Sequence, residues 1–163
     1  MSETYPIPTA LIASALYPGW QSCMNVTTEY APIAESANIV RTWNGTAVNL
    51  TAPQFRLYRV TLSCDEDLVP PALAHLWPGE RFSLVPAEEW SEPTTKPQQR
   101  AAHTGTTRIV DAHFVAGTSG RRLYRPVLDL VVTEPWRVSV NERTKLHSWQ
   151  LVAEEYAHPS LGA

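Results

Sequence analysis

FRLYRVTLSC, at residues 55–64, carries the strongest indication of a β-fold in this sequence. Aromatic and β-branched residues dominate the run, as is typical of a strand. Side chains alternate between the two faces of a strand, so Tyr58, Val60 and Leu62 are expected to share one face. The opposite face carries Arg59 and is partly polar. Such a strand is covered on one side only, which favours an antiparallel sheet.

The chain leaves this run through a stiff crossing and enters a second strand. Residues 65–67, DED, are expected to form an acidic turn, which either is solvated or holds a hard cation with further oxygen ligands. The prolines at residues 70–71 predict a helical turn, which WPG at residues 77–79 ends. Beyond it Phe82 and Leu84 are expected to point inward, and Trp77 is expected to cover the core. The crossing therefore needs no active site to explain its composition.

Further strand signals flank this pair of strands on both sides. Asn44-Gly45, between IVRTW and TAVNL, predicts a β-hairpin with a type I′ turn. Residues 91–104 hold two prolines and no large apolar residue, so they are expected to form a mobile loop. Four strand-like runs follow, with a hairpin tip at residues 117–120. We therefore predict a mainly β fold, an antiparallel β-sandwich or barrel-like domain at residues 38–157, with a C-terminal tail at 158–163.

Residues 1–37 show a different pattern. ALIASAL, after Pro8-Thr9, predicts one short helix, because proline is favoured in a first helical turn and YPG at residues 17–19 would end it. The remainder has no firm periodicity, so the segment is expected to be an extended N-terminal arm. Its apolar side chains need burial, which a neighbouring subunit or the protein's own sheet could supply. We expect contact with a neighbouring subunit, through the candidate interface residues Ile7, Leu11, Ile12, Leu16 and Trp20.

The overall composition narrows the class of function. A chain of 163 residues with 44% hydrophobic residues suits one folded domain rather than a disordered protein. Its net charge is −3 and it has no run of Lys and Arg, so a nucleic-acid partner is not expected. No apolar run approaches the length of a membrane span. The start, MSETYPIP, lacks the features of a secretory signal, which predicts synthesis in the cytoplasm.

Residues with catalytic or metal-binding chemistry are sparse. The sequence has no G-x-S-x-G, P-loop, G-x-G-x-x-G, HExxH or EF-hand motif. Asp111 and His113 would share a strand face, as half of a metal site, an acid–base pair or a surface ion pair. Cys23 and Cys64 have no metal-ligand spacing and are expected to be reduced thiols, with a single disulfide as the alternative. We expect no enzyme activity, no metal and no cofactor.

Six tryptophans are more than one core of this size needs. Most of them lie near predicted turns or strand ends, where they could cover sheet edges, contact another protein or stack on a sugar. Three of them are taken as further candidate residues of a protein interface: Trp43, Trp90 and Trp136.

Five segments of the sequence resemble a known family. They are RTWNG at residues 41–45, YRVTLSCDE at 58–66, PPALAHLWPGE at 70–80, YRPVLDLVV at 124–132 and SWQLVAEE at 148–155. Together they are similar to small structural proteins encoded in the tail modules of long-tailed bacteriophages. Residues 1–38 lie outside the resemblance, which carries no catalytic residues with it.

The resemblance implies that the protein is a bacteriophage virion component, a minor tail or tail-tip protein made in the host cytoplasm. It would act by assembling with other virion proteins of the tail, as a homo-oligomer or ring. Placement on the capsid, as a decoration protein, is a variant of this hypothesis. The alternative from a different class is a carbohydrate-binding β-sandwich module that uses Trp and Tyr platforms.

Overall fold

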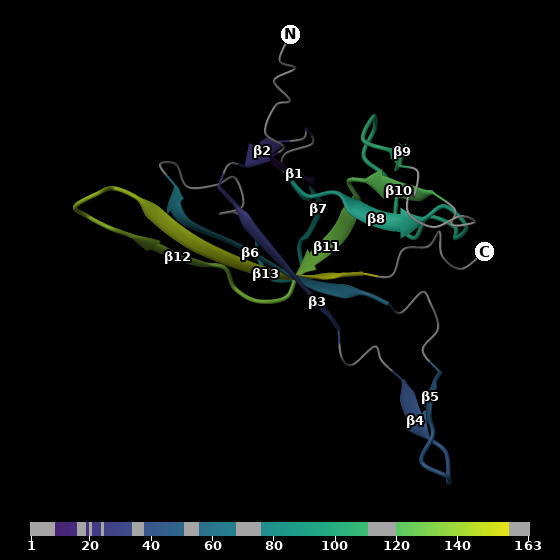
Figure 1. The fold of residues 1–163 in the computed structure, drawn as a ribbon. Coiled ribbons are helices and arrows are strands. Elements are labelled where there is room, and N and C mark those ends of the chain that lie inside the picture. The colour runs from purple at the N-terminus through teal and green to yellow at the C-terminus, as the bar shows by residue number, and fades with distance from the viewer. Residues whose placement is uncertain are drawn as a thin grey trace. The chain divides into compact units, whose positions relative to one another are not determined.

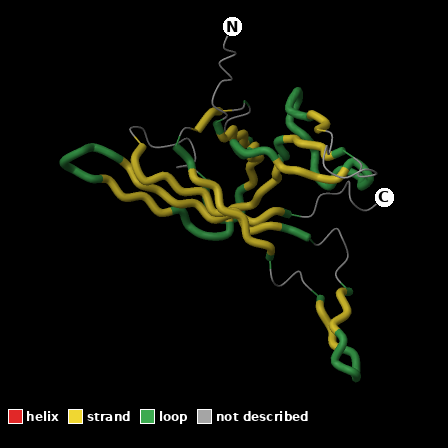
Figure 2. Tube along the Cα trace, in the orientation of Figure 1, coloured by secondary structure: helices red, strands yellow, loops and turns green. Residues whose placement is uncertain are grey.

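The computed structural model describes residues 9–15, 19, 21–23, 25–33, 38–50, 56–67, 76–110 and 120–156. Figure 2 shows strands and loops but no helix in these residues. The strand pairings within each unit of the chain are antiparallel. The predicted mainly β, antiparallel fold is thus confirmed, although the described strands form open sheets rather than a closed barrel.

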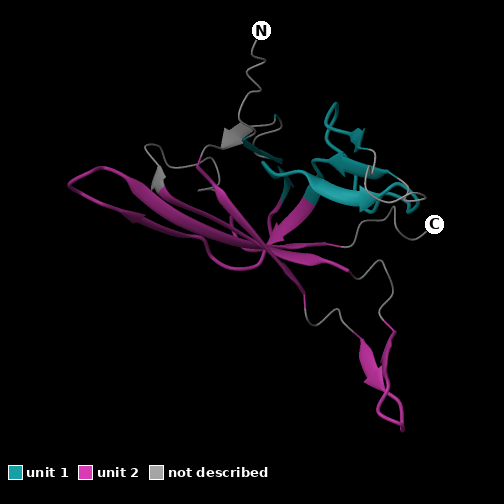
Figure 3. Cartoon of the chain, in the orientation of Figure 1, with its two compact units in different colours: residues 1–24, 82–128 teal, residues 25–81, 129–163 magenta. Residues whose placement is uncertain are grey.

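Two compact units make up the chain (Figure 3). Unit 1 combines Met1–Met24 with Phe82–Leu128, and unit 2 combines Asn25–Arg81 with Asp129–Ala163. Each unit is therefore built from two separate stretches of sequence. The expected division into an arm at 1–37 and one domain at 38–157 does not follow these boundaries, because residues 11–14 pair with residues 82–85.

One sheet of unit 1 contains the segment that was expected to be helical. Strand β1 (Ala10–Ser14) lies between β2 (Gln21–Cys23) and β7 (Arg81–Val85), so the prediction of a short helix is wrong. Ala10 and Ile12 are only 2% and 5% exposed, and they alternate with half-buried neighbours. The ladder to β7 and the burial of these two side chains override the helical propensity of Ala and Leu.

The second sheet of unit 1 has the order β8-β10-β9. Its strands are β8 (Trp90–Pro93), β9 (Arg108–Val110) and β10 (Arg121–Tyr124). Residues 91–93 were expected to belong to a mobile loop, but they pair with β10, about thirty residues further along the chain. Thr94 continues this pairing, since its backbone N–H and its hydroxyl both donate to the carbonyl of Gly120. Only this long-range ladder, which leaves no local signal, turns the polar run into a strand.

Arg125 connects three segments of unit 1 at the end of β10. Its guanidinium donates to the backbone carbonyl of Pro86 at 2.7 Å and to the carbonyls of Thr9 and Val85. Burial lowers the pKa of this guanidinium, and the nearby carboxylate of Glu89 acts in the opposite direction. One side chain therefore holds the start of β1 and the end of β7 beside β10.

The long strands of unit 2 pair in one antiparallel sheet (Figure 1). Its order is β11-β13-β6-β3, and β12 pairs with the same edge of β13 as β11 does. The bounds are β3 (Thr27–Pro32), β6 (Tyr58–Asp67), β11 (Leu128–Val132), β12 (Arg137–Val140) and β13 (His147–Glu155).

The alternation predicted for β6 is confirmed, and β13 shows the same pattern. Val60 and Leu62 of β6 are buried, and so are Leu151 and Ala153 of β13. The intervening side chains, such as Thr61, point to the other face and are partly or fully exposed. We call the apolar side the inner face and the polar side the outer face of unit 2.

The turn that enters β7 corrects one expectation about the core. Gly79 has a φ of +92°, and Glu80 donates its backbone N–H to the carbonyl of Trp77, so Pro78-Gly79 forms a type II turn. Trp77 is 73% exposed and does not cover the core as predicted, because Leu76 occupies the buried position before the turn. The inward positions of Phe82 and Leu84 are confirmed. The helical turn expected after the prolines at 70–71, the tip at 117–120 and the tail at 158–163 lie wholly or mainly outside the described residues.

Replacement of Arg125 by alanine should destabilise unit 1. The change removes charge-assisted hydrogen bonds to three carbonyls, so we expect the free energy of unfolding to fall by about 3 kcal/mol. Urea denaturation followed by tryptophan fluorescence measures this. Arg121→Ala is the control. Among the described residues, the exposed Arg121 side chain donates one hydrogen bond, to the exposed hydroxyl of Ser91, so its effect should stay within about 0.5 kcal/mol. An Arg125→Ala protein as stable as the wild type would contradict the assignment.

Candidate functional site

A β-hairpin at residues 38–50 presents the RTWNG motif. It consists of β4 (Ile39–Arg41) and β5 (Ala47–Asn49), which pair only with each other among the described strands. The predicted hairpin is confirmed, but its turn is not type I′. Gly45 has a φ of +83° while Asn44 keeps a negative φ, and Gly45 donates its N–H to the carbonyl of Thr42. This is a three-residue loop, a type I turn followed by a glycine bulge.

Side-chain bonds within the loop explain this turn type. The amide oxygen of Asn44 accepts hydrogen bonds from the hydroxyl of Thr42 and, at 3.3 Å, from the backbone N–H of Thr46. These bonds bridge the loop from both sides. They favour a negative φ at Asn44, which a type I turn requires. A type I′ turn would need a positive φ at this residue.

No residue of the hairpin is buried, although it carries several large apolar side chains. All residues from 38 to 50 are exposed, and Trp43 at the tip is 99% exposed. An isolated two-stranded hairpin is marginally stable in water, because it has no apolar face to bury. The hairpin thus has the composition of a buried element without a cover among the described residues. Its exposed large apolar residues are Ile39, Val40, Trp43, Val48 and Leu50.

The other predicted interface tryptophans have contacts within the chain. The guanidinium of Arg100 lies 5.2 Å from the ring centroid of Trp90, a cation–π contact. The ring of Trp136 lies 6.5 Å from that of Trp149, which is buried on the inner face of unit 2. Both candidates are only half-exposed. Trp43 is therefore the described candidate that offers its whole indole to a partner.

The two candidate interface residues that the structure describes in the N-terminal segment, Leu11 and Ile12, do not form a free surface. Ile12 is buried in unit 1 and Leu11 is half-buried, so the described part of the expected arm completes its own sheet. Ile7, Leu16 and Trp20 lie outside the described residues, as do Asp111 and His113.

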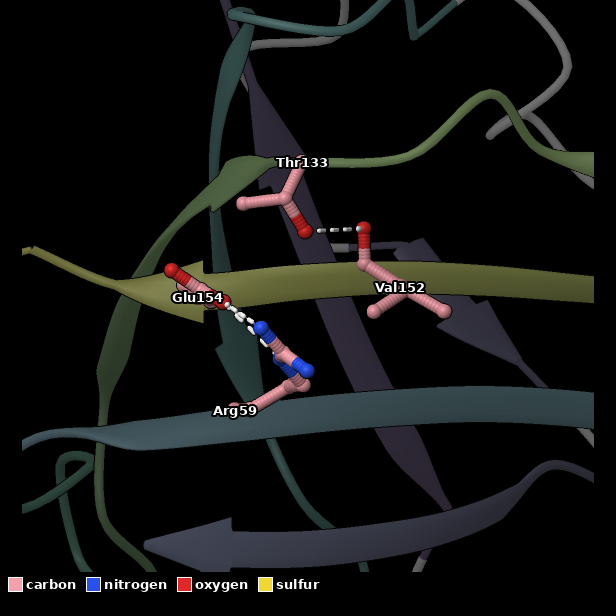
Figure 4. Close-up of polar contacts among 4 residues, drawn as sticks. All are labelled: Arg59, Thr133, Val152 and Glu154. Atoms are coloured by element: carbon pink, nitrogen blue, oxygen red, sulfur yellow. Dashed lines mark hydrogen bonds and ion pairs between the residues drawn. The ribbon is translucent and has the colours of Figure 1, made fainter. Parts of the chain in front are cut away.

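The outer face of unit 2 is mainly polar, although it also carries Val131 and Val152. At one end Arg59 of β6 forms an ion pair with Glu154 of β13, with 2.6 Å between Nη2 and Oε1 (Figure 4). Beside it, the hydroxyl of Thr133 lies 3.4 Å from the carbonyl of Val152, where the chain passes from β11 toward β12. Polar groups at this end therefore satisfy one another.

The other end of the outer face is hollowed into a groove of about 390 Å³. It lies over β6, β12 and β13, and its lining consists of Ser63, Asp65, Arg137, Val138, Ser139, Ser148, Trp149 and Gln150. Val138 and Trp149 alternate to the inner face, so their main chain borders the groove while the other six contribute side chains. The groove was not predicted from the sequence. Three runs have a polar residue at every second position, but no local pattern indicates that these runs form neighbouring strands.

Two further properties limit the chemistry of the described residues. No group of three or more His, Cys, Asp or Glu side chains is placed to hold a metal ion in the part of the chain that the structure describes. Within the same residues no helix is long and apolar enough to cross a membrane.

Comparison with known proteins assigns no family to the chain. No family model, no curated protein and no solved structure matches it. Function is therefore argued from the hairpin and the groove themselves.

A buried tyrosine, Tyr124, is hydrogen-bonded to the half-buried Glu92 beside Trp90 in unit 1. Tyr124 pairs with Trp90 across β10 and β8, and its hydroxyl donates to Glu92 Oε1 at 2.6 Å. Burial of the phenol raises its pKa well above the ordinary value of 10.0, and the hydrogen bond and charge of Glu92 act in the same direction. The charge of Arg100 has a smaller, opposing effect. Tyr124 therefore stays protonated in the folded chain when an exposed tyrosine would ionise.

The raised pKa of Tyr124 predicts a specific loss of stability in alkali. Below pH 10 the phenol is protonated in both states, so its contribution is fully present. Above it only the unfolded chain ionises, and stability falls by up to about 1.4 kcal/mol per pH unit. The free energy of unfolding of wild type minus that of Tyr124→Phe should be about 1.5 kcal/mol at neutral pH and shrink above about pH 10. The same difference at neutral and alkaline pH would contradict this.

Proposed function

We propose that this protein is a structural component of a bacteriophage tail, a minor tail or tail-tip protein that acts by binding other virion proteins. In this proposal the chain belongs to a ring or another homo-oligomer within the tail, and hairpin 38–50 binds the adjoining tail protein. The exposed hairpin is the observation that carries the proposal. Its loop, RTWNG, is also one of the segments that resemble tail proteins.

The energetics of the hairpin support a protein partner. Burying one large apolar side chain contributes roughly 1.5–3 kcal/mol, and the hairpin exposes five of them. Exposed apolar surface of this kind marks interaction sites in folded proteins. Tryptophan is enriched among the residues that dominate binding energy, and Trp43 in the loop is 99% exposed. Two short strands with open outer edges can also extend a partner's sheet by backbone hydrogen bonds.

A second argument concerns the backbone of the hairpin. β4 and β5 form a ladder with each other and with no other described strand. Exposed sheet edges are usually protected by charge or proline. Arg41 is the single charged residue in the hairpin, so its edges remain suited to pairing.

Replacement of Trp43 by serine should prevent incorporation into tails without unfolding the chain. Because Trp43 makes no buried contact, stability should change by no more than about 0.5 kcal/mol. Loss of a dominant interface tryptophan weakens binding by about 30-fold or more. The gene is inactivated in the phage genome that carries it, and variants are supplied from a plasmid. Infectious titre and the amount of chain in purified tails are then measured.

Two variants serve as controls. Trp43→Phe keeps an aromatic side chain at the tip and should restore most of the titre. Trp77→Ser removes another exposed tryptophan, outside the hairpin, and should leave the titre unchanged. Normal incorporation of Trp43→Ser would refute the role of the hairpin. Purified tailed particles that lack the wild-type chain would refute the function itself.

A further inference from the structure

We propose that the groove over β6, β12 and β13 is a binding site for a neutral saccharide. The inference does not depend on the tail function, because it rests on the outer face of unit 2 and not on the hairpin. The alternative hypothesis from the sequence placed sugar binding on exposed Trp and Tyr side chains. The surface proposed here is a different one, lined by polar side chains.

A β-bulge accounts for the hollow. Trp149 pairs with Cys64 and His147 pairs with Asp67, so residues 65–66 of β6 stand opposite Ser148 alone. An extra residue bends its strand and increases the local twist. The hydroxyl of Ser148 donates to the backbone carbonyl of Asp65 at 2.6 Å and fixes the bend. The groove therefore follows from the register between β6 and β13.

The register also places donors and acceptors side by side. Arg137, Gln150 and Ser63 stand opposite one another on three neighbouring strands, and Ser139 stands opposite Ser148 in the next row. Adjacent strands lie about 4.8 Å apart. Arginine only donates, Asp65 only accepts, and glutamine and serine do both. A sugar hydroxyl donates and accepts at once, so adjacent hydroxyls can be matched along such a surface.

Three polar side chains of the groove have no hydrogen-bond partner among the described residues. No hydrogen bond or ion pair among the described residues involves the side chains of Arg137, Asp65 or Gln150. At the opposite end of the same face Arg59 and Glu154 neutralise each other. Both ends of the outer face have the polar composition of a solvated sheet face, so composition does not distinguish them. Of the two ends, only the groove combines a concave shape with donors and acceptors that have no partner among the described residues.

Charge and polarity select the ligand class. The lining carries one cation, Arg137, and one anion, Asp65, on strands that are two spacings apart. An anionic ligand would meet the carboxylate and a cationic one the guanidinium, so neither is favoured. An apolar ligand would strip water from six polar side chains without replacing their hydrogen bonds. The volume is near the lower end of the roughly 300–1,000 Å³ of small-molecule sites, which suits a short saccharide.

The proposal is tested by titrating the full-length, ¹⁵N-labelled chain with neutral sugars in two-dimensional NMR. Glucose, galactose, mannose and the N-acetylglucosamine disaccharide are the probes, at millimolar concentrations. At least one should shift the amide resonances of residues 137–139 and 148–150. Arg137→Ala and Gln150→Ala should each weaken that binding about tenfold or more. Both side chains are exposed, so the spectra of the variants should otherwise remain those of the folded chain.

Glu29→Gln is the matched control. Glu29 is an exposed residue of β3 on the same outer face but outside the groove, so the change should leave saccharide binding unaltered. Three outcomes would overturn the proposal. They are no shift with any of the sugars, shifts that persist unchanged in Arg137→Ala, and shifts caused by the zwitterion glycine but by none of the sugars. None of these outcomes alters the test of Trp43, so failure of one proposal is distinguishable from failure of the other.

Discussion

The strict alternation of β13 is the constraint on which unit 2 depends. This one strand pairs with β6 along one edge and with both β11 and β12 along the other. Its odd positions, Trp149, Leu151 and Ala153, are buried, while Ser148 and Gln150 line the groove. A slip of one residue would exchange these two sets. It would put amide and hydroxyl groups into the core, so burial of the odd positions also fixes the chemistry of the outer face.

The two candidate surfaces call for different partners because their chemistry is opposite. Hairpin 38–50 exposes several large apolar side chains, which only a large surface can cover. The groove exposes unpaired polar groups, which a small hydroxylated molecule can satisfy one by one. A tail component that joins neighbouring proteins through one surface and contacts a sugar through the other would use both. The assembly role and the saccharide-binding role are thus compatible on one chain.

Local patterns predicted several of the strands, although not β1 or β8, and did not predict which strands are partners. The alternation around Tyr58 and around Trp149 is visible in sequence because period-two burial is a local property. The groove was not visible, since Ser63, Arg137 and Gln150 meet only through pairings between distant runs. The prediction that Trp77 covers the core was wrong for a related reason. Which side of a turn faces the core depends on contacts with segments distant in sequence. Trp43 was named as an interface candidate from its place near a predicted turn, and the structure adds that its side chain is 99% exposed.

The position of β1 changes which segment of the chain is available for assembly. An assembly arm must be able to leave its own domain without exposing the core. β1 cannot do so, because Ala10 and Ile12 are buried, the strand pairs with β7, and Arg125 holds the carbonyl of Thr9 just before it. Removing it would uncover the edge of β7 and leave a buried guanidinium short of an acceptor. Hairpin 38–50 meets the requirement, since it buries nothing. The described N-terminal strand therefore belongs to the scaffold of unit 1, and hairpin 38–50 rather than β1 carries the proposed assembly surface.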